Sequence, residues 1–356
     1  MNAIAFEPFT LSGLTLQNRI VMAPMTRTRA IGSVPGELVA EYYTQRASAG
    51  LIITEGVAPS DVGIGYPDTP GLYSEPQIAG WRSVTEAVHA AGGAIFAQIM
   101  HVGRIGDPSL HRDGQNTVAP SAIAAEGQIY THQGMIPYVV PDPMTPEVIR
   151  QTIADYVNAA RNAVEAGFDG VELHGANGYL IHQFLSSSAN IREDEWGGDI
   201  DGHIRFAVEV AQAVVAAIGS HRVGFRISPA NTLHSITETA TRELYLKLIS
   251  ELSPLKLAYL HLAESNAGAE HTAELVAAWP GALILNPFTG DRPTDASDLE
   301  LIGQGVDLIS FGTNFIGTPD LPLRLRQGAA LNPLRPQFFY GISSEGYTDY
   351  PALSGS

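Results

Sequence analysis

Residues 145–185 read TPEVIRQTIADYVNAARNAVEAGFDGVELHGANGYLIHQFL, which places a helix pattern, a strand pattern and a polar turn in succession. Thr145 is a candidate N-cap, Pro146 suits the first helical position, and Gly167 follows the last expected helical turn. The apolar run at 170–175 then predicts a buried strand, and the glycines after it predict a turn. A helix that leads directly into a buried strand is the repeating unit of parallel α/β folds.

The same alternation of apolar runs and helix-like stretches recurs along the whole chain. The runs are rich in Val, Ile and Leu and do not alternate strictly, which favours parallel strands buried on both faces. About eight such units favour an α/β fold of the (β/α)8 TIM barrel type, formed as a single domain by residues 1–356. A doubly wound sheet is the competing fold, but no G-x-G-x-x-G follows any run. The expected strands cover residues 19–24, 51–56, 94–101, 170–175, 222–228, 257–264, 281–286 and 306–312.

Three segments stand outside this alternation. The opening FEPFTLSGLTLQN (6–18) predicts an N-terminal hairpin that caps the bottom of the barrel. An extended insertion after the third strand (101–144) is rich in Gly and Pro and has no helix pattern, and we expect it to fold over the active-site face. The last twenty residues are aromatic and rich in turn formers, so we expect them to be ordered.

Composition narrows the function. The chain has 356 residues, of which 45% are hydrophobic, and no cysteine, which excludes a disulfide scaffold, a thiolate nucleophile and a Cys-ligated metal. A net charge of −17 argues against nucleic acid or an anionic membrane as a partner. There is no secretory signal pattern and no apolar run near the ~20 residues that span a bilayer, so a cytoplasmic protein with a small-molecule substrate is expected.

The polar residues of HGANGY (174–179) are the strongest functional signal, because the chemistry of a TIM barrel gathers at the C-terminal ends of its strands. His174 and Asn177 can both donate hydrogen bonds toward one oxygen and stabilise charge that develops there. Tyr179 is a hydroxyl acid with an ordinary pKa near ~10, suited to giving up a proton. These groups suit an enolate, but they supply no electron pair, so a redox cofactor is required.

Two other kinds of site were weighed. His174 with His182, or His101 with Glu172, could ligate a metal, but the chain has no H-E-x-x-H and no compact cluster, so no metal is expected. A serine hydrolase is disfavoured because there is no G-x-S-x-G, and the serines after residue 185 are interpreted as a polar cap. His182 is expected to be a packed or capping histidine. The histidines expected to be superficial or structural are His89, His111, His132, His203, His221, His234 and His271.

Over nearly its whole length the sequence resembles the Old Yellow Enzyme family of FMN-dependent ene-reductases. HGANGYL (174–180) and GYTDYP (346–351) are specific to that family among barrels. The other matching motifs, in order, are APMTR (23–27), ITEG (53–56), GYPDTPGLYS (65–74), AQIMHVGR (97–104), VAPSAI (118–123), NIREDEWGGDIDGHIRF (190–206) and GFRISP (224–229).

The resemblance implies reduction of activated C=C bonds, in α,β-unsaturated carbonyl or nitro compounds, with FMN and either NADPH or NADH. It implies that His174 and Asn177 bind the substrate oxygen, while Tyr179 protonates Cα after hydride passes from flavin N5 to Cβ. It also implies that Tyr66 and Tyr347 line the substrate pocket. The residues it places on the flavin are Pro24, Met25 and Gly56 by backbone contact, Thr26 at O4, Gln98 at the pyrimidine edge and Arg226 near N1 and O2.

The sequence departs from the family in the pocket and at the FMN phosphate. Met100 stands where a tryptophan is frequent, which changes the shape of the pocket. In LNPFTGD (285–291) Pro287 offers no N–H, and in FGTNF (311–315) Thr313 replaces the phosphate-binding arginine. We therefore expect FMN to be bound more weakly than in relatives. Its phosphate would be held by neutral donors at Thr289, Gly290, Gly312, Thr313 and Asn314.

Alternatives to this function stay open at the level of sequence. The altered phosphate loops also suit a barrel with another cofactor or none, acting as an isomerase or a binding protein. An oxidase or dehydrogenase working in the reverse direction would use the same residues. The expected assembly is a monomer or a homodimer.

Overall fold

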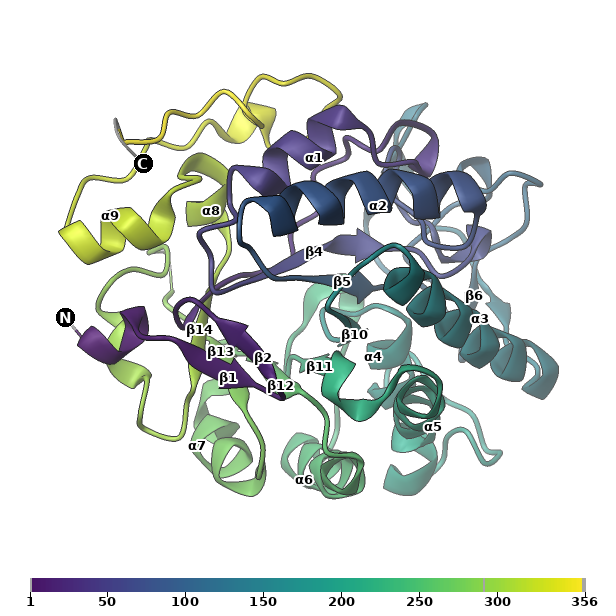
Figure 1. Cartoon of the computed structure of the whole chain (residues 1–356). Coiled ribbons are helices and arrows are strands. Elements are labelled where there is room, and N and C mark those ends of the chain that lie inside the picture. Colours follow the sequence, from purple (N-terminus) through teal and green to yellow (C-terminus); the bar gives the residue numbers. More distant parts are fainter. Residues whose placement is uncertain (1, 291, 354–356) are drawn as a thin grey trace.

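The computed structural model describes residues 2–290 and 292–353. Eight parallel strands close into a barrel, and helices lie around its outside (Figure 1). Five of the strands, at residues 51–57, 95–99, 170–175, 223–227 and 259–263, are buried along their whole length. Burial on both faces explains why these runs are apolar without alternation. The strands, in their order around the barrel, are β10 (Gly170–Gly175), β11 (Val223–Ile227), β12 (Tyr259–Ala263), β13 (Leu283–Asn286), β14 (Leu308–Phe311), β3 (Ile20–Met22), β4 (Leu51–Val57) and β5 (Ile95–Ile99).

The expected α/β barrel is confirmed. Strand β10 has the expected bounds, β4 is one residue longer, and the other six strands are two or three residues shorter than the expected runs. After β13 a 3-10 turn, Asp298–Leu301, stands where the other units have an α-helix. The helices are α1 (Glu37–Thr44), α2 (Glu75–Ala90), α3 (Pro146–Glu165), α4 (Leu180–Leu185), α5 (Ile200–Ile218), α6 (Thr241–Leu252), α7 (Ala269–Ala278), α8 (Thr313–Gly317) and α9 (Leu321–Gln327).

Helix α3 begins and ends as its sequence predicts. The Thr145 hydroxyl accepts a hydrogen bond from the Val148 N–H, and Pro146 occupies the first turn, where its missing N–H is not needed. Gly167 lies just beyond the helix with φ +90°, a conformation that glycine adopts without strain. These ends fix where the chain enters β10 and therefore where its polar residues emerge.

The N-terminal hairpin closes the bottom of the barrel. Strands β1 (Phe9–Leu11) and β2 (Leu14–Leu16) pair antiparallel, with Phe9 opposite Leu16. Leu11 and Leu16 are buried in a cluster with the first residues of the barrel strands, among them Leu51 and Leu308. This plug leaves the opposite end of the barrel for the functional residues.

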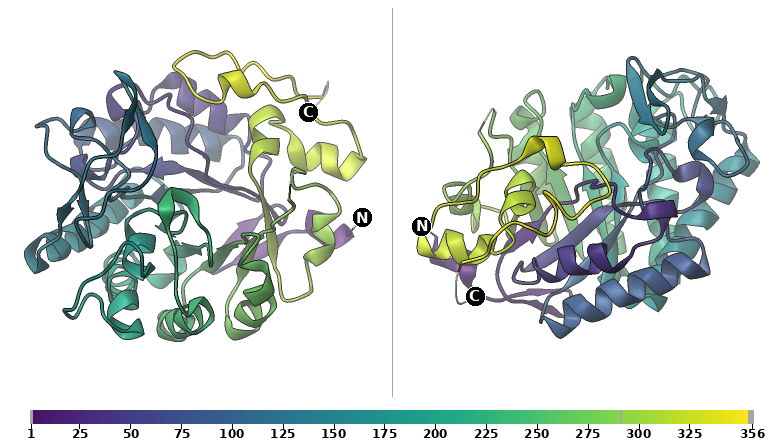
Figure 2. Two further views of the ribbon diagram at one scale, coloured as in Figure 1. Left: turned by 180° about the vertical axis from the view of Figure 1, so that it is seen from behind. Right: turned by 90° about the horizontal axis from the view of Figure 1, so that it is seen from above.

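The insertion and the C-terminal segment lie outside the βα alternation (Figure 2). The insertion contains a hairpin of β7 (Gln128–Thr131) and β8 (Gly134–Pro137), and a short parallel pair of β6 (Val118–Ala119) and β9 (Asp142–Pro143). The structure describes the C-terminal segment up to residue 353, and residues 354–356 lie outside the described residues. Buried Arg27 donates hydrogen bonds to the carbonyls of Phe339 and Gly346, which ties this segment to the loop after β3.

Candidate active site

The turn after β10 brings the donors and the acid of HGANGY to the C-terminal rim of the barrel. Asn177 has φ +56°, a left-handed conformation that asparagine tolerates, and Gly178 has φ +78°. A Cβ on Gly178 would lie 2.6 Å from the Leu233 carbonyl oxygen, so only glycine fits there. The turn therefore presses against the loop after β11, and α4 begins immediately after Tyr179.

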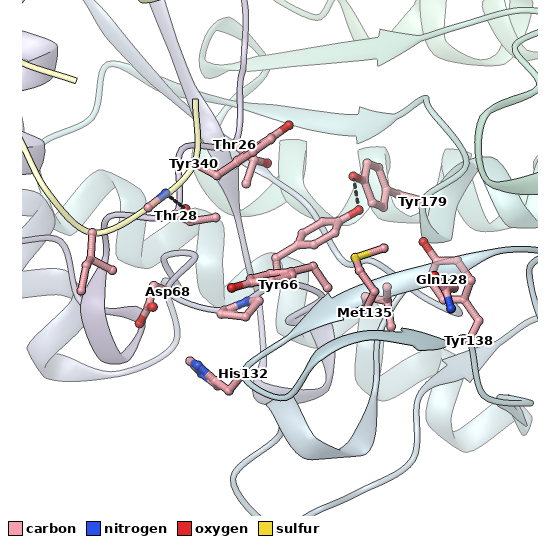
Figure 3. A pocket seen from close by; sticks show the side chains of 15 residues that line it. Thr26, Thr28, Tyr66, Asp68, Gln128, His132, Met135, Tyr138, Tyr179 and Tyr340 are labelled. Atoms are coloured by element: carbon pink, nitrogen blue, oxygen red, sulfur yellow. Dashed lines mark hydrogen bonds between the residues drawn. The ribbon is translucent and has the colours of Figure 1, made fainter. Parts of the chain in front are cut away.

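Tyr179 lies on the wall of a cavity of about 560 Å³ (Figure 3). Its hydroxyl is 3.0 Å from the hydroxyl of Tyr66, and its ring centroid is 5.3 Å from that of His174. Burial raises the pKa of Tyr179 to about 12. The phenol therefore stays protonated at neutral pH, as a proton donor must.

His174 is almost fully buried and neutral. Its Nδ1 lies 3.2 Å from Nε2 of Gln98, which lies 2.8 Å from the carboxylate of Glu172. Burial, with the nearby charge of Arg226, holds the pKa of His174 well below its usual range. An amide N–H can only donate, so Nδ1 accepts and the ring proton is on Nε2.

Asn177 is held by the loop after β11. Its N–H donates to the hydroxyl of Ser228 at 2.8 Å, and its carbonyl accepts from His234 Nδ1 at 2.8 Å. Asn231 Nδ2 donates to Asn177 Oδ1 at 3.3 Å. His234 also lies 5.1 Å from the Tyr179 ring, measured between centroids. His234 was expected to be a surface or structural histidine, and its hydrogen bond to the Asn177 carbonyl is a structural contact that also places it beside Tyr179.

The residues expected on the flavin ring lie at neighbouring strand ends. Thr26 lines the cavity, and a Cβ on Gly312 would meet the Met25 sulfur at 3.8 Å, so these loops adjoin. Pro24 follows β3 beside them. A Cβ on Gly56 would lie 2.4 Å from the end of the Met100 side chain, so these two residues are in close contact.

The surroundings of Arg226 show whether this end of the site suits a flavin ring. It faces His174 and His261 in the strand register and is buried, and its Nε has no hydrogen-bond partner among the described residues. Burial lowers its pKa while Glu172 opposes that effect. A buried guanidinium with an unpaired N–H is costly and calls for an acceptor. An anionic flavin edge supplies one, so the ring end of the site fits FMN.

The expected phosphate end contains no free cation in the described part of its two loops. Thr313 begins the five-residue helix α8, and Gly290 has φ +64°. The side chain of Asn314 donates to the Thr294 carbonyl, and the Thr289 hydroxyl donates to the Arg292 carbonyl at 2.5 Å. Arg292 is a cation that sequence reasoning missed, but it pairs with Asp298 at 2.6 Å. Residue 291 lies outside the described residues.

The residues that line the cavity differ from the prediction at one position, Tyr347. Tyr347 does not line the cavity in the described structure. It is fully buried and stacked on Tyr42, with ring centroids 4.0 Å apart. Tyr340, from the same C-terminal segment, lines the cavity instead, and Tyr66 does so as expected. The lining residues are Thr26, Thr28, Tyr66, Pro67, Asp68, Gln128, Ile129, Tyr130, His132, Met135, Tyr138, Tyr179, Tyr340, Gly341 and Ile342.

Other predicted residues are placed as follows. Met100 packs in a buried cluster that Tyr66, Tyr138 and Tyr179 contact, one layer behind the cavity wall. His182 is a buried capping residue as expected: its Nδ1 accepts from the Gly178 N–H, and its Nε2 lies 2.6 Å from Glu238. His132 is exposed, as expected, and it also lies on the cavity wall.

Metal ligation and membrane insertion were also examined. Between residues 2 and 353, leaving out 291, no three His, Asp or Glu side chains are grouped as metal ligands would be. In the same residues no helix has both the length and the apolar character needed to cross a membrane.

Comparisons with known proteins agree with this geometry. The sequence model of the NADH:flavin oxidoreductase / NADH oxidase family matches residues 5–332. A probable flavin mononucleotide-dependent alkene reductase of Leishmania infantum is 40% identical, over 98% of each chain. The structure of morphinone reductase is 41% identical with a TM-score of 0.93, over 99% of this chain and 96% of that one. An Old Yellow Enzyme homologue from Zymomonas mobilis is 38% identical with a TM-score of 0.92, over 98% and 99% of the two chains.

Proposed function

We propose which residues of this chain perform its reaction, starting from its family. The chain belongs to the NADH:flavin oxidoreductase / NADH oxidase family, and it is an ene-reductase of the Old Yellow Enzyme type that depends on FMN and consumes NAD(P)H. The substrates are activated alkenes, with a C=C bond conjugated to a carbonyl or nitro group. The observation that supports the residue assignment is that Tyr179 lies on the cavity wall with its ring 5.3 Å from that of His174, and that Asn177 belongs to the turn between them.

FMN, once reduced by NAD(P)H, supplies the hydride that the side chains cannot. The Nε2–H of His174 and the Nδ2 of Asn177 bind the oxygen of the substrate. Negative charge grows on that oxygen as hydride reaches Cβ, and fixed donors stabilise this charge without reorganising. Because His174 is buried and neutral, it donates without adding a fixed charge to the site.

Tyr179 holds the proton that Cα receives. Its raised pKa makes it a weak acid, so it transfers the proton only to a carbon that carries developing negative charge. The Tyr66 hydroxyl, 3.0 Å away, is placed to orient the phenol and to pass a proton back to it. Arg226 and Gln98 would hold the polar edge of the flavin ring, with Pro24, Met25, Thr26 and Gly56 along its other contacts.

A barrel without redox chemistry is not favoured. The family match and the similarity to flavin-dependent relatives agree with the buried cation at Arg226, whose Nε lacks a partner among the described residues. A buried N–H without a partner is costly, and the polar edge of a flavin would supply an acceptor for it.

The test is the visible absorption spectrum of the purified protein, recorded before and after excess FMN and desalting. Flavin bands near ~450 nm that bleach with NADPH or NADH under anaerobic conditions and return on addition of cyclohex-2-enone are expected. A protein that stays colourless after FMN is added would overturn the proposal and support the non-redox alternative.

We also propose that this chain binds FMN less tightly than its relatives. The loops after β13 and β14 offer neutral groups at Thr289, Gly290, Gly312 and Thr313, and the one nearby guanidinium, Arg292, is already paired with Asp298. Neutral hydrogen bonds to a phosphate are weaker than charge-assisted ones.

Restoring a cation at this end should tighten FMN binding. Thr313→Arg is expected to lower the FMN dissociation constant about tenfold to a hundredfold, the equivalent of one charge-assisted hydrogen bond. Thr313→Gln adds similar length without charge and is the matched control. Fluorescence quenching of FMN titrated with apoprotein measures both. Equal affinities of the two variants and the parent chain would contradict the assignment of this end to the phosphate.

The compartment, the domain organisation and the oligomeric state of the enzyme are also proposals. We propose that the protein is cytoplasmic, which a chain without cysteine suits. We propose that residues 1–356 act as one domain and that the enzyme is a monomer or a homodimer.

A further inference from the structure

We propose that Glu172 and Asn231 are positioning residues that fix His174 and Asn177 as hydrogen-bond donors toward the substrate. The inference rests on the proposed function of that pair. A histidine can present either a donor or an acceptor, and an asparagine amide can present either end, so an oxygen-binding pair needs something that chooses. In this structure Glu172 sets which nitrogen of His174 carries the proton, and Asn231 sets which end of the Asn177 amide faces the substrate.

The first choice begins at Glu172, which is completely buried beneath the site. An ionised carboxylate only accepts hydrogen bonds, so the Gln98 amide must turn its Nε2 toward Glu172 Oε1, 2.8 Å away. The same Nε2 lies 3.2 Å from His174 Nδ1. Nδ1 must accept there, which places the proton of the neutral ring on Nε2. The charge on Glu172 thus determines, through Gln98, which nitrogen of His174 donates.

Glu172 is itself held in place. Its Oε2 lies 2.8 Å from Nδ1 of His261, and Nε2 of His261 lies 2.9 Å from the Ser310 hydroxyl. Burial alone would raise the pKa of Glu172, but His261, Arg226 and Gln98 together hold it below its usual range. The carboxylate is therefore ionised and cannot rotate away from Gln98.

The second choice begins at a backbone N–H in the loop after β11. The N–H of Leu233 donates to Asn231 Oδ1 at 2.8 Å, which fixes the orientation of the Asn231 amide. Its Nδ2 therefore faces Asn177 Oδ1, at 3.3 Å. Since Oδ1 of Asn177 is the acceptor in that contact, its Nδ2 is the end left for the substrate. Without these two constraints, lone pairs of His174 and Asn177 could face the substrate oxygen and repel it.

Glu172→Gln tests the first choice. The new amide can donate to Gln98, so Gln98 can turn its oxygen toward His174 Nδ1 and draw the ring proton to that nitrogen. Nitrogen-15 NMR of histidine-labelled protein reports the tautomer directly, with His174→Ala identifying the signal. We expect Nε2–H in the parent chain, Nδ1–H in Glu172→Gln, and about tenfold weaker binding of cyclohex-2-enone by the variant holoprotein.

Glu238→Gln is the matched control, because it neutralises another buried carboxylate that holds a histidine, His182. It should leave the His174 tautomer unchanged. Two NMR results would overturn the role of Glu172. One is a His174 in the parent chain that carries its proton on Nδ1, and the other is a His174 that keeps its proton on Nε2 in Glu172→Gln.

Asn231 is tested by a ranking of two variants. Asn231→Asp keeps the acceptor for Leu233 N–H but faces Asn177 with an oxygen, so Asn177 turns its Nδ2 away from the substrate. Asn231→Ala removes both contacts and leaves Asn177 free. We expect cyclohex-2-enone affinity to fall more in Asn231→Asp, by about tenfold, than in Asn231→Ala. A purely structural role predicts the opposite order, and that order would overturn the proposal.

The NMR tautomer and the enone affinities distinguish failure of the positioning roles from failure of the proposed function. If the parent holoprotein binds no cyclohex-2-enone, the proposed function fails, and the tautomer of His174 is still decided by NMR. If the parent chain binds it and the variants keep both affinity and tautomer, only the positioning roles fail.

Discussion

Tyr179→Phe is expected to slow the oxidation of the reduced enzyme by cyclohex-2-enone at least about 100-fold, the range typical of a lost general acid. The substitution removes only the hydroxyl that holds the proton for Cα and leaves the ring that packs 5.3 Å from His174. Flavin reduction by NAD(P)H needs no proton from Tyr179 and should proceed at the parent rate. Anaerobic stopped-flow measurement of each half-reaction separates the two.

Tyr66→Phe is the matched control for this prediction. It removes the partner hydroxyl 3.0 Å from Tyr179 but leaves the acid in place, so a loss of less than about tenfold is expected. The pH profile gives a second check. Burial raises the pKa of Tyr179 to about 12, so it stays protonated and enone reduction should not fall through loss of this proton below about pH 10. Equal slowing of both half-reactions in Tyr179→Phe would contradict the acid role.

The barrel was predictable because its signals are local. Strands buried on both faces must be apolar throughout, and the ends of α3 are marked by Thr145, Pro146 and Gly167. The hairpin at the bottom and the insertion also follow from turn residues and spacing. The 3-10 turn after β13 was not predicted, because a short polar segment carries no periodicity that distinguishes it from a helix.

The proximity of the HGANGY residues was predictable because one motif contains them, whereas the contacts between distant segments were not. His174, Asn177 and Tyr179 lie within a single turn, whereas Asn231 and His234 reach it from the next loop. Their contacts with Asn177 depend on how the two loops pack, which no local pattern encodes.

The C-terminal segment shows the same limit. It contains several aromatic residues, and the resemblance to the family implied that Tyr347 lines the pocket. Tyr347 is instead stacked on Tyr42 beside Arg27, and Tyr340 lines the cavity. Which tyrosine faces inward is decided by the hydrogen bonds of Arg27 to the carbonyls of this segment, contacts more than three hundred residues apart in the chain.

Replacing His174 and Asn177 together by alanine is expected to weaken the binding of cyclohex-2-enone to the oxidised holoprotein about 30-fold to 150-fold. Two donors are lost, and each hydrogen bond to an uncharged oxygen contributes about 1 to 1.5 kcal/mol. Titration of the oxidised holoprotein, followed by the change in flavin absorbance, measures the dissociation constant without any turnover. The cavity wall at Tyr66 and Tyr179 is untouched, so the loss reports on the donors and not on the apolar part of the pocket.

His221→Ala with Asn158→Ala is the control for this double variant. It removes the same two chemical groups from exposed positions, one before β11 and one on α3, and should leave the dissociation constant unchanged. Retained affinity in His174→Ala/Asn177→Ala would show that the substrate oxygen lies elsewhere. Combined with Tyr179→Phe, the measurement divides the site by function. In the proposed assignment the Tyr179 hydroxyl serves Cα and the donor pair serves the substrate oxygen. The double variant should therefore lose binding, whereas Tyr179→Phe should bind the enone normally and fail only when the proton is needed.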